Sequence, residues 1–422
     1  MTTVDTPGTG TQAAPGDRGQ LVKAVTAGLI AAFVGFSSSF AVVLEGLEQV
    51  GATRAQAASG LMALSLGMGA CGIFLSLRTR MPVSVAWSTP GAALLAGSAS
   101  VSGGFPAAVG AFLVCGALIV VTGLWRRLGE WVTAIPKPLA GAMLAGILLP
   151  LCLAPAKAVQ ANPAAGLAIV VTWAVVAAFK KLYAMPAAVL VTFVVIIVSS
   201  DVPLSGLGPL WPQPTLVTPE FTASALIGIG LPLYLVTMAS QNIPGIAVLN
   251  ANGYEPRPGP LFSWTGAFGL ASAPFGGHAL NLAAITAALC ADEGAGPDPR
   301  KRFRAAAVSG AAYLVFGVGA GAAVTFVGAA PPLLIEAVAG LALLGALGTS
   351  LLSAMSDAEH REAAAVTLVV TVSGVQFFGI SGAFWGLLAG GAVYALGDWR
   401  AARRSAGVAD SSSGAARTPG SA

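Results

Sequence analysis

Long apolar segments separated by short polar ones run through almost the whole chain. Charged residues make up 9% of the 422 positions and hydrophobic residues 56%, whereas soluble domains carry roughly 25% charged residues. A helix needs roughly 20 apolar residues to cross a bilayer. The pattern predicts an all-α polytopic membrane protein with fourteen transmembrane segments, near 21–45, 54–75, 82–98, 105–125, 131–152, 162–179, 185–200, 221–242, 259–273, 275–291, 305–328, 331–353, 362–379 and 382–398.

The fourteen segments form two series of seven. We expect a first repeat over 20–200, an extracytoplasmic connector over 201–219 and a second repeat over 220–398. The polar ends, 1–19 and 399–422, are expected to be disordered cytoplasmic tails, and no cleavable signal peptide is expected. Because each repeat has an odd number of segments, the two repeats should be inverted relative to each other.

The distribution of basic residues supports this topology. With both termini cytoplasmic, 19 of the 21 Lys and Arg residues fall on the inner side, and Arg54 and Lys157 are the two on the outer side. Cytoplasmic segments of membrane proteins carry such an excess of positive charge. The net charge of +4 therefore follows from membrane orientation, and we expect the lipid bilayer, not nucleic acid, as the surrounding partner.

The tenth segment cannot be one regular helix. Pro274, Gly276 and Gly277 interrupt it, and the residues from His278 onward have helical periodicity. A helix that begins inside a membrane leaves its first backbone N–H groups without partners, which is tolerated only where they face protein or a water-filled cavity. Together with the positive end of the helix dipole, such groups make an anion site, and broken helices are typical of the substrate sites of secondary transporters.

The third segment is interrupted at the matching position of the first repeat. Val85 and Trp87 favour a short strand, and Ser88 or Thr89 is an expected N-cap, followed by Pro90 in the first helical turn. Two helix N-termini, at Ser88–Gly91 and at Gly276–His278, are therefore expected to converge on one anion near the membrane midplane.

His278 is the only ionisable residue expected well inside a segment. An ionisable residue within a membrane is a functional hypothesis by default, and imidazole, with an unperturbed pKa of about 6.5, can exchange protons near neutral pH. The alternative is a neutral histidine that hydrogen-bonds a backbone carbonyl as part of the packing. Asn281, one helical turn further, is expected on the same face.

Other polar residues of the apolar segments are candidates for the same site. Gln241 and Asn242 are expected to end the eighth segment, with a helix stop at Pro244. Buried amides need partners, which a polar ligand or a neighbouring helix can supply. Hydroxyl groups such as that of Ser38 more often bond their own backbone. The four cysteines, Cys71, Cys115, Cys152 and Cys290, have no metal-ligand spacing, and neither a metal nor a cofactor is expected.

Two stretches resemble the benzoate/proton symporter family. These are TMASQNIPGIAVL at 237–249 and APFGGHALNLAAITA at 273–287, and the resemblance covers about residues 20–400. It implies import of benzoate or a close aromatic carboxylate with protons across a bacterial inner membrane. It also implies the fold of the uracil/xanthine permeases and sulfate-permease type anion transporters. In that fold the third and tenth segments each pair a strand with a half-helix, and a core domain moves past a gate domain, often in a homodimer.

The resemblance also implies roles for particular residues. Gln241 and His278 stand where the uracil permeases use glutamates, and an amide and an imidazole attract a carboxylate that glutamates would repel. The aromatic ring is expected against Phe36, Trp87 or Phe275. The full set expected to bind substrate is Phe36, Ser38, Trp87, Ser88, Thr89, Gly91, Gln241, Asn242, Phe275, Gly276, Gly277, His278 and Asn281.

Two schemes for the route of the proton fit the sequence, and the first is favoured. In the first scheme, protonated His278 pairs with the carboxylate, and each ligand strengthens binding of the other. In the second, His278 stays neutral, and the proton travels on the substrate or on Glu45 or Glu336 near the outer ends of their segments.

Three other functional classes fit the residues less well. A nucleobase or inorganic-anion permease of the same fold would need acidic residues at the site or no proton carrier. An integral membrane enzyme would need clustered catalytic groups, so we expect a transporter and not an enzyme. An ion channel would need rings of charge or a filter sequence.

Overall fold

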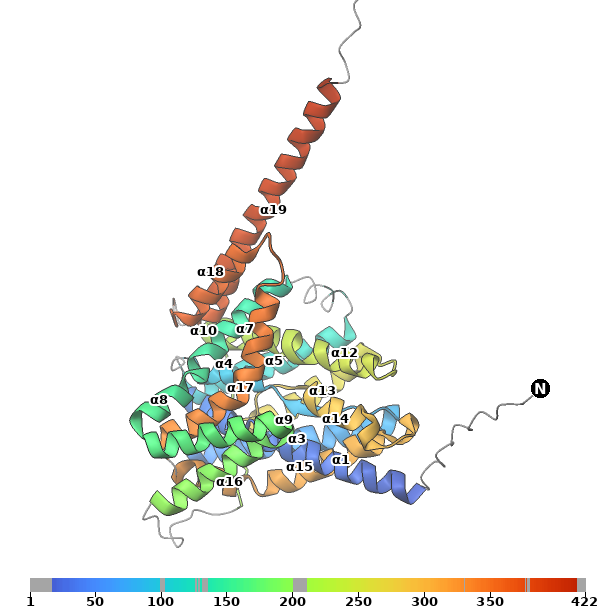
Figure 1. Ribbon diagram of the computed structural model, residues 1–422, viewed down its shortest axis with the longest axis vertical. Helices are drawn as coiled ribbons and strands as arrows, with labels where there is room; N and C mark the ends of the chain where they lie inside the picture. The colour runs from blue at the N-terminus through green and yellow to red at the C-terminus, as the bar shows by residue number, and fades with distance from the viewer. Residues whose placement is uncertain are drawn as a thin grey trace, which may run out of the picture.

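The structure is a computed structural model that describes residues 17–98, 103–125, 127, 130, 136–199, 211–329, 331–375, 377 and 380–415. The chain is almost entirely helical, and its helices pack into one body from which α18 and α19 project (Figure 1). The elements of the first half are α1 (Asp17–Ser37), α2 (Phe40–Gln49), α3 (Arg54–Thr79), β1 (Val85–Trp87), α4 (Thr89–Ala96), α5 (Gly104–Leu124), α7 (Lys137–Cys152), α8 (Ala154–Ala161) and α9 (Pro163–Ser199).

The second half contains more short elements. They are α10 (Ala223–Ala225), η2 (Leu226–Gly230), α11 (Leu231–Thr237), η3 (Met238–Asn242), α12 (Ile243–Ala251), α13 (Pro258–Ser272), η4 (Ala273–Phe275), β2 (Leu280–Leu282), α14 (Ile285–Ala291), η5 (Glu293–Ala295), η6 (Pro299–Lys301), α15 (Phe303–Val318), α16 (Ala320–Ala329), α17 (Pro332–Ala354), α18 (Arg361–Val372) and α19 (Gly382–Ala415). Here η2 and η3 are π-helical, and η4 to η6 are 3₁₀-helical.

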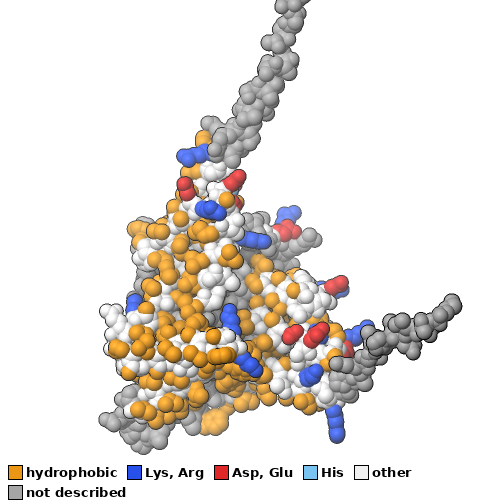
Figure 2. Space-filling model, viewed as in Figure 1, with side chains coloured by type: hydrophobic (Ala, Val, Ile, Leu, Met, Phe, Trp, Pro, Cys, Tyr) orange, Lys and Arg blue, Asp and Glu red, His pale blue; other side chains and the backbone are white. Residues whose placement is uncertain are grey.

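The helices have the length and composition of membrane spans. Among the described residues, seven helices are long and apolar enough to cross a bilayer, and α15 with α16, bent by 56°, makes an eighth candidate. Much of the visible surface is hydrophobic, and charged side chains lie mainly toward the edges (Figure 2). The chain is therefore a mostly helical, multi-pass membrane protein; the finer count of fourteen stays a prediction.

Some predicted boundaries differ from the structure. The first segment bends at Ser38–Ser39, between α1 and α2. The sixth and seventh segments together make α9, where a non-helical backbone at Lys180 separates two helices at the place that the sequence predicted. The second tail is helical as far as Ala415, so it is not the disordered segment predicted from 399, while residues 201–210 of the connector and the outermost residues of both tails lie outside the described part.

The eighth segment does not stop at Pro244, where the sequence predicted a helix end. The helix continues through η3 into α12, and the N–H of Ile243 bonds the carbonyl of Met238, five residues back. Proline has no N–H to donate to the residue four positions earlier. A π-helical turn changes the hydrogen-bond register around this gap, so the chain stays helical.

The two strands form an antiparallel ribbon within the bundle. Val85 pairs with Leu282 and Trp87 with Leu280. The strand of the first repeat was predicted from its residues, and a strand in the tenth segment was implied by the family resemblance. Residues 280–282 themselves have a helical spacing, so the sequence placed them in the half-helix and not in β2. The half-helix of the tenth segment therefore begins at Ile285, not at Gly276–His278 as the sequence predicted. Residues 278–282 are extended because β1 offers them backbone partners that would otherwise be unpaired in an apolar interior.

Close helix contacts hold the ribbon in place. On α3 and α15, Gly69 and Gly310 face each other, and a Cβ added to either would lie 2.6 Å or 2.7 Å from the other's carbonyl oxygen. Small residues of this kind let membrane helices approach backbone to backbone.

A buried arginine fixes the far end of the half-helix α14. Arg302 is 6% exposed, and it donates from Nε to the Gly296 carbonyl and from a guanidinium N–H to the Ala291 carbonyl, each at 2.7 Å. The charge therefore satisfies a terminal carbonyl of the helix and interacts favourably with its negative end.

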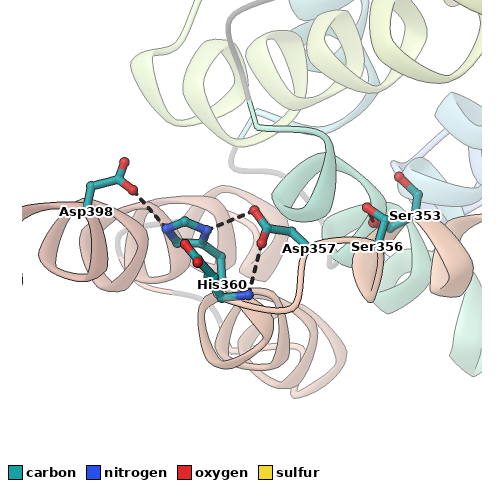
Figure 3. Close-up of polar contacts among 6 residues, drawn as sticks. Ser353, Ser356, Asp357, His360 and Asp398 are labelled. Atoms are coloured by element: carbon teal, nitrogen blue, oxygen red, sulfur yellow. Dashed lines mark hydrogen bonds and ion pairs between the residues drawn. The ribbon is translucent and has the colours of Figure 1, made fainter. Parts of the chain in front are cut away.

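The α17–α18 turn is joined to α19 by a histidine between two carboxylates (Figure 3). His360 Nδ1 lies 2.8 Å from Asp357 Oδ2, Nε2 lies 2.9 Å from Asp398 Oδ1, and the ring stacks on Tyr394 at 3.8 Å. Ionised carboxylates only accept hydrogen bonds, so both ring nitrogens must donate and the ring is an imidazolium. Desolvation alone lowers the pKa of His360, but the hydrogen bonds to Asp357 and Asp398 outweigh it and raise the pKa.

The histidine contact should weaken as pH rises. Because the pKa of folded His360 is raised above 6.5, its stabilisation is complete below that value and is lost as pH rises through the folded pKa. We expect hydrogen exchange in α18 to speed up as the pH rises above about 6.5, after correction for intrinsic rates. His360→Phe keeps a stacked ring without the charge and should remove this dependence. Equal protection of the parent protein across the range would contradict the assignment.

Candidate anion-binding site

The ribbon places the two half-helices at its opposite ends. Because β1 and β2 are antiparallel, α4 begins beside Ala279, whose carbonyl accepts from Ser88 N at 3.0 Å. In the same way, α14 begins beside Ser84, whose carbonyl accepts from Ala283 N at 3.0 Å. Three paired residues lie between these ends, which at roughly 3.3 Å per residue is about 10 Å. The helix N-termini thus lie on either side of one short ribbon.

The start of α4 has fewer free donors than the sequence suggested. Ser88 Oγ accepts from Gly91 N at 3.1 Å and from Thr237 Oγ1 at 2.8 Å, so the predicted N-cap forms. Pro90 has no N–H, and the N–H of Ala92 bonds the Ser88 carbonyl. In the first turn, the backbone N–H of Thr89 therefore remains available to an anion, and the side chain of Thr89 is partly exposed. The positive end of the helix dipole acts at the same place.

The start of α14 has no side-chain cap. Ala284 stands at the N-cap position, and Thr286 in the first turn uses its hydroxyl for a 2.7 Å hydrogen bond with Ser84. The helix has only seven residues, so its dipole is weaker than that of a long helix. The ribbon therefore presents two unequal helix ends, of which α4 is the better organised.

An aromatic group packs beside the ribbon. Phe36 contacts Trp87 edge to face at 5.5 Å and Phe316 at 5.1 Å between ring centroids. Trp87 Nε1 donates to Ser39 Oγ at 2.8 Å, whereas Ser38 Oγ bonds the Gly35 carbonyl of its own helix. The structure thus brings Phe36 and Trp87 together, and Ser38 has a backbone partner.

The two adjacent amides differ in their surroundings. Asn242 is fully buried: its Oδ1 accepts from Leu282 N at 2.9 Å, and its Nδ2 contacts Met238 Sδ at 3.1 Å. Gln241 is partly exposed, and within the described part of the chain its amide has no hydrogen-bond partner. Asn242 therefore holds the open edge of β2, while Gln241 is free to bind a ligand.

His278 and Asn281 are both buried in the ribbon segment. The Nδ1 of His278 accepts from Ala279 N at 2.8 Å, its ring lies edge to face against Phe112, and its Nε2 has no protein partner. Asn281 donates to the Leu282 carbonyl at 2.8 Å, and its Oδ1 has no protein partner. An Nδ1 that accepts a hydrogen bond carries no proton, so this geometry is that of a neutral imidazole protonated at Nε2.

Three other predicted residues lie in the turn before the ribbon. Gly276 has φ +90°, which favours glycine, and a Cβ on Gly277 would lie 2.8 Å from Ser272 Cβ. Ser59 Oγ donates to the Phe275 carbonyl at 3.0 Å. The turn reverses the chain against α3, so the need for glycine here is explained by backbone geometry and packing.

The two predicted acids lie on different helices. Glu45 is on α2 and Glu336 on α17, and these two helices pack against each other. Glu45 Oε2 is buried without a partner among the described residues. Gly46, the next residue, packs against the Ala92 carbonyl of α4, so the acid is on a helix in direct contact with the half-helix of the site.

The hydroxyls that hold the half-helices were not predicted from the sequence. Thr237 bonds Ser88, and Thr286 bonds Ser84. One signal was present for Thr237, which stands four residues before Gln241 and so lies on the same helical face.

The paired strands and half-helices are the features that define the fold class. The structure is similar to the transmembrane domain of the cyanobacterial bicarbonate transporter BicA, with a TM-score of 0.60 and 15% identity, covering 88% of this chain and 97% of that one. It is also similar to murine Slc26a9, an anion transporter in the inward-facing state, with a TM-score of 0.57 and 14% identity over 89% of this chain and 68% of that one. At these identities the likeness establishes the fold alone.

Sequence comparison identifies the family. The family model described as benzoate membrane transport protein (BenE) matches residues 20–396, so the chain belongs to this family of membrane transporters and is not an enzyme. It is 40% identical over 371 residues to the inner membrane protein YdcO of Escherichia coli K12, and 31% identical over 381 residues to the benzoate membrane transport protein of Acinetobacter baylyi. Each match covers 88% of this chain and 94% of the relative. The predicted family is confirmed.

The division between the two amides can be tested through stability. Asn242→Ala leaves the buried N–H of Leu282 without its acceptor, so we expect a loss of about 1–3 kcal/mol. Gln241→Ala removes no internal hydrogen bond and should change stability by less than about 0.5 kcal/mol. Unfolding of both purified variants in detergent gives the comparison. Equal losses would show that Gln241 also has a structural role.

Proposed function

We propose that this protein imports benzoate or a closely related aromatic carboxylate together with protons. Family membership and the benzoate transport relative support the substrate class. The observation that carries most weight is the amide of Gln241, which has no hydrogen-bond partner among the described residues. It lies one turn beyond Thr237, whose hydroxyl donates to Ser88 at the start of α4. A carboxylate there would meet an amide donor, the Thr89 N–H and a helix dipole, with the Phe36–Trp87 group available for its ring.

The donors at this site suit an anion of modest affinity. A helix N-terminus contributes about 0.3–2 kcal/mol to a negative charge, depending on burial. Burial of an aromatic ring adds about 25 cal/mol per Å² of apolar area. Together these terms are consistent with micromolar to millimolar binding, which allows a transporter to release its substrate.

Our proposed topology is fourteen segments in two inverted repeats of seven, with both termini cytoplasmic. In support, the strands and half-helices occur at matching places in the two halves, and the basic residues segregate to one side. Alternating access would then move the half-helices past α7 and α17, as a core domain past a gate domain. The homodimer implied by family resemblance stays a prediction.

For the proton, we favour the scheme that uses the glutamates. Protonation of His278 at Nδ1 would place two N–H groups against each other, because Ala279 N already donates to that atom. Glu45 and Glu336 instead stand on α2 and α17, which pack against each other, and the buried Oε2 of Glu45 has no partner among the described residues, so a bound proton would remove an unpaired buried charge. Movement of α2 relative to α17 would change their separation and so release that proton.

The substrate assignment predicts a charge-sensitive site. Purified protein in vesicles should accumulate radiolabelled benzoate under an inward proton gradient. Gln241→Glu places a like charge against the carboxylate and should reduce uptake at least about tenfold, a cost of about 1.4 kcal/mol. Gln213→Glu adds the same charge on the exposed connector and should transport normally. No benzoate accumulation by the parent protein would refute the proposal.

Coupling is tested at Glu45. Glu45→Gln removes the proton carrier, so it should abolish accumulation against a gradient while benzoate exchange between equal compartments continues. His278→Gln should stay coupled if the histidine is a neutral part of the packing. The reverse result, with coupling lost only at His278, would restore the imidazolium scheme.

The topology is tested with single introduced cysteines. Gln213→Cys on the connector should react with an impermeant thiol reagent added outside intact cells, and Glu293→Cys only after lysis. Both positions are exposed, and three native cysteines are buried. Labelling of Glu293→Cys from outside would rule out the proposed orientation.

A further inference from the structure

A large cavity separates the ends of α7 and α17 from the η3–α12 helix. Its volume is about 520 Å³, within the range of about 300–1,000 Å³ typical of small-molecule sites. Most lining side chains are apolar or small, including Met143, Val236 and Ile243. Lys137 is the only charged side chain among the described residues that line it.

The cavity is lined by the helix that carries the Gln241–Asn242 pair. Ser240 and Ile243 line it on either side of this pair in the sequence. On the opposite wall it is lined by the first turn of α7 and the last turn of α17. In the proposed topology both of these helix ends are cytoplasmic, so the cavity lies at the inner end of that helix.

Packing between α7 and α17 fixes the position of Lys137. Ser353 Oγ donates to the Lys137 carbonyl at 3.3 Å. A Cβ on Gly141, one turn further along α7, would lie 2.8 Å from Ser353 Cβ and 2.9 Å from the Ser350 carbonyl oxygen. The backbone at Lys137 is therefore held on a rigid wall, while its exposed side chain can follow an anion.

We infer that this cavity is the inner vestibule of the transport path, and that Lys137 is a release-side binding residue for the substrate carboxylate. The inference rests on the proposed function and names a residue that it does not use. Apolar walls with one cation match an aromatic ring with one negative charge. The lysine lowers the energy of the anion as it leaves the helix ends, and because water reaches the lysine the contact is weak enough for release.

Kinetics measured separately on the two membrane faces test the inference. In inside-out vesicles, Lys137→Gln should raise the KM for benzoate about two- to fivefold, as expected for a solvent-exposed ion pair. The outer KM should not change. Lys137→Arg should restore the parent value, and Lys181→Gln, which removes another exposed lysine predicted to be cytoplasmic, serves as the control.

Occupancy of the cavity gives an independent readout. Ala247 lines the cavity and is exposed, so Ala247→Cys in a Cys152→Ala background should react with a charged thiol reagent from the inner side. Benzoate should slow this reaction, and less so when Lys137→Gln is added. If the parent protein transports benzoate but Lys137→Gln leaves the inner KM unchanged, the vestibule proposal alone is overturned. The same holds if benzoate does not protect Ala247→Cys. Absence of benzoate transport would overturn the proposed function, and the vestibule with it.

Discussion

The backbone pairing of β1 with β2 is the constraint on which the rest of the site depends. Extended backbone is costly in an apolar interior unless each N–H and C=O finds a partner. Here each strand supplies hydrogen-bond partners to the other. The N–H of Leu282 donates instead to the side chain of Asn242. Because the partners come from the two halves of the chain, neither half can complete this part of the site alone.

From the ribbon, a second set of contacts fixes the helix ends. Ser88 and Thr237 join the start of α4 to the eighth segment, and Ser84 and Thr286 join β1 to the start of α14. These hydroxyls use up donors that could otherwise bind an anion. Among the described residues the groups that stay free include the Thr89 N–H, the Gln241 amide and His278 Nε2, and a small number of placed polar groups is usual in a small-molecule site.

Local sequence rules predicted one half of this arrangement better than the other. Val85, Trp87, Ser88 and Pro90 carry strand, cap and first-turn preferences, and the structure follows them. The segment from His278 to Leu282 has helical spacing, but pairing with a strand nearly 200 positions earlier makes it extended. No property of that segment by itself reveals its partner, so the start of the half-helix was misplaced by about two turns.

The family motifs predicted a region for the site without dividing its residues by role. Adjacent amides at 241 and 242 look equivalent in sequence, and only the three-dimensional arrangement shows that one is used by the protein itself. The same holds for Gly276 and Gly277. The positive φ of the turn favours glycine at position 276, and close packing against Ser272 favours it at position 277. Nothing in the sequence distinguished Lys137 from the many other cations predicted to be cytoplasmic.

The contact between Gly69 and Gly310 has a consequence for movement. Two backbones in direct contact have no side chains between them that could change rotamer, so the contact between α3 and α15 leaves little room for adjustment. We therefore expect the two helices to move together when the half-helices are displaced. Relative movement is expected where longer side chains separate the helices.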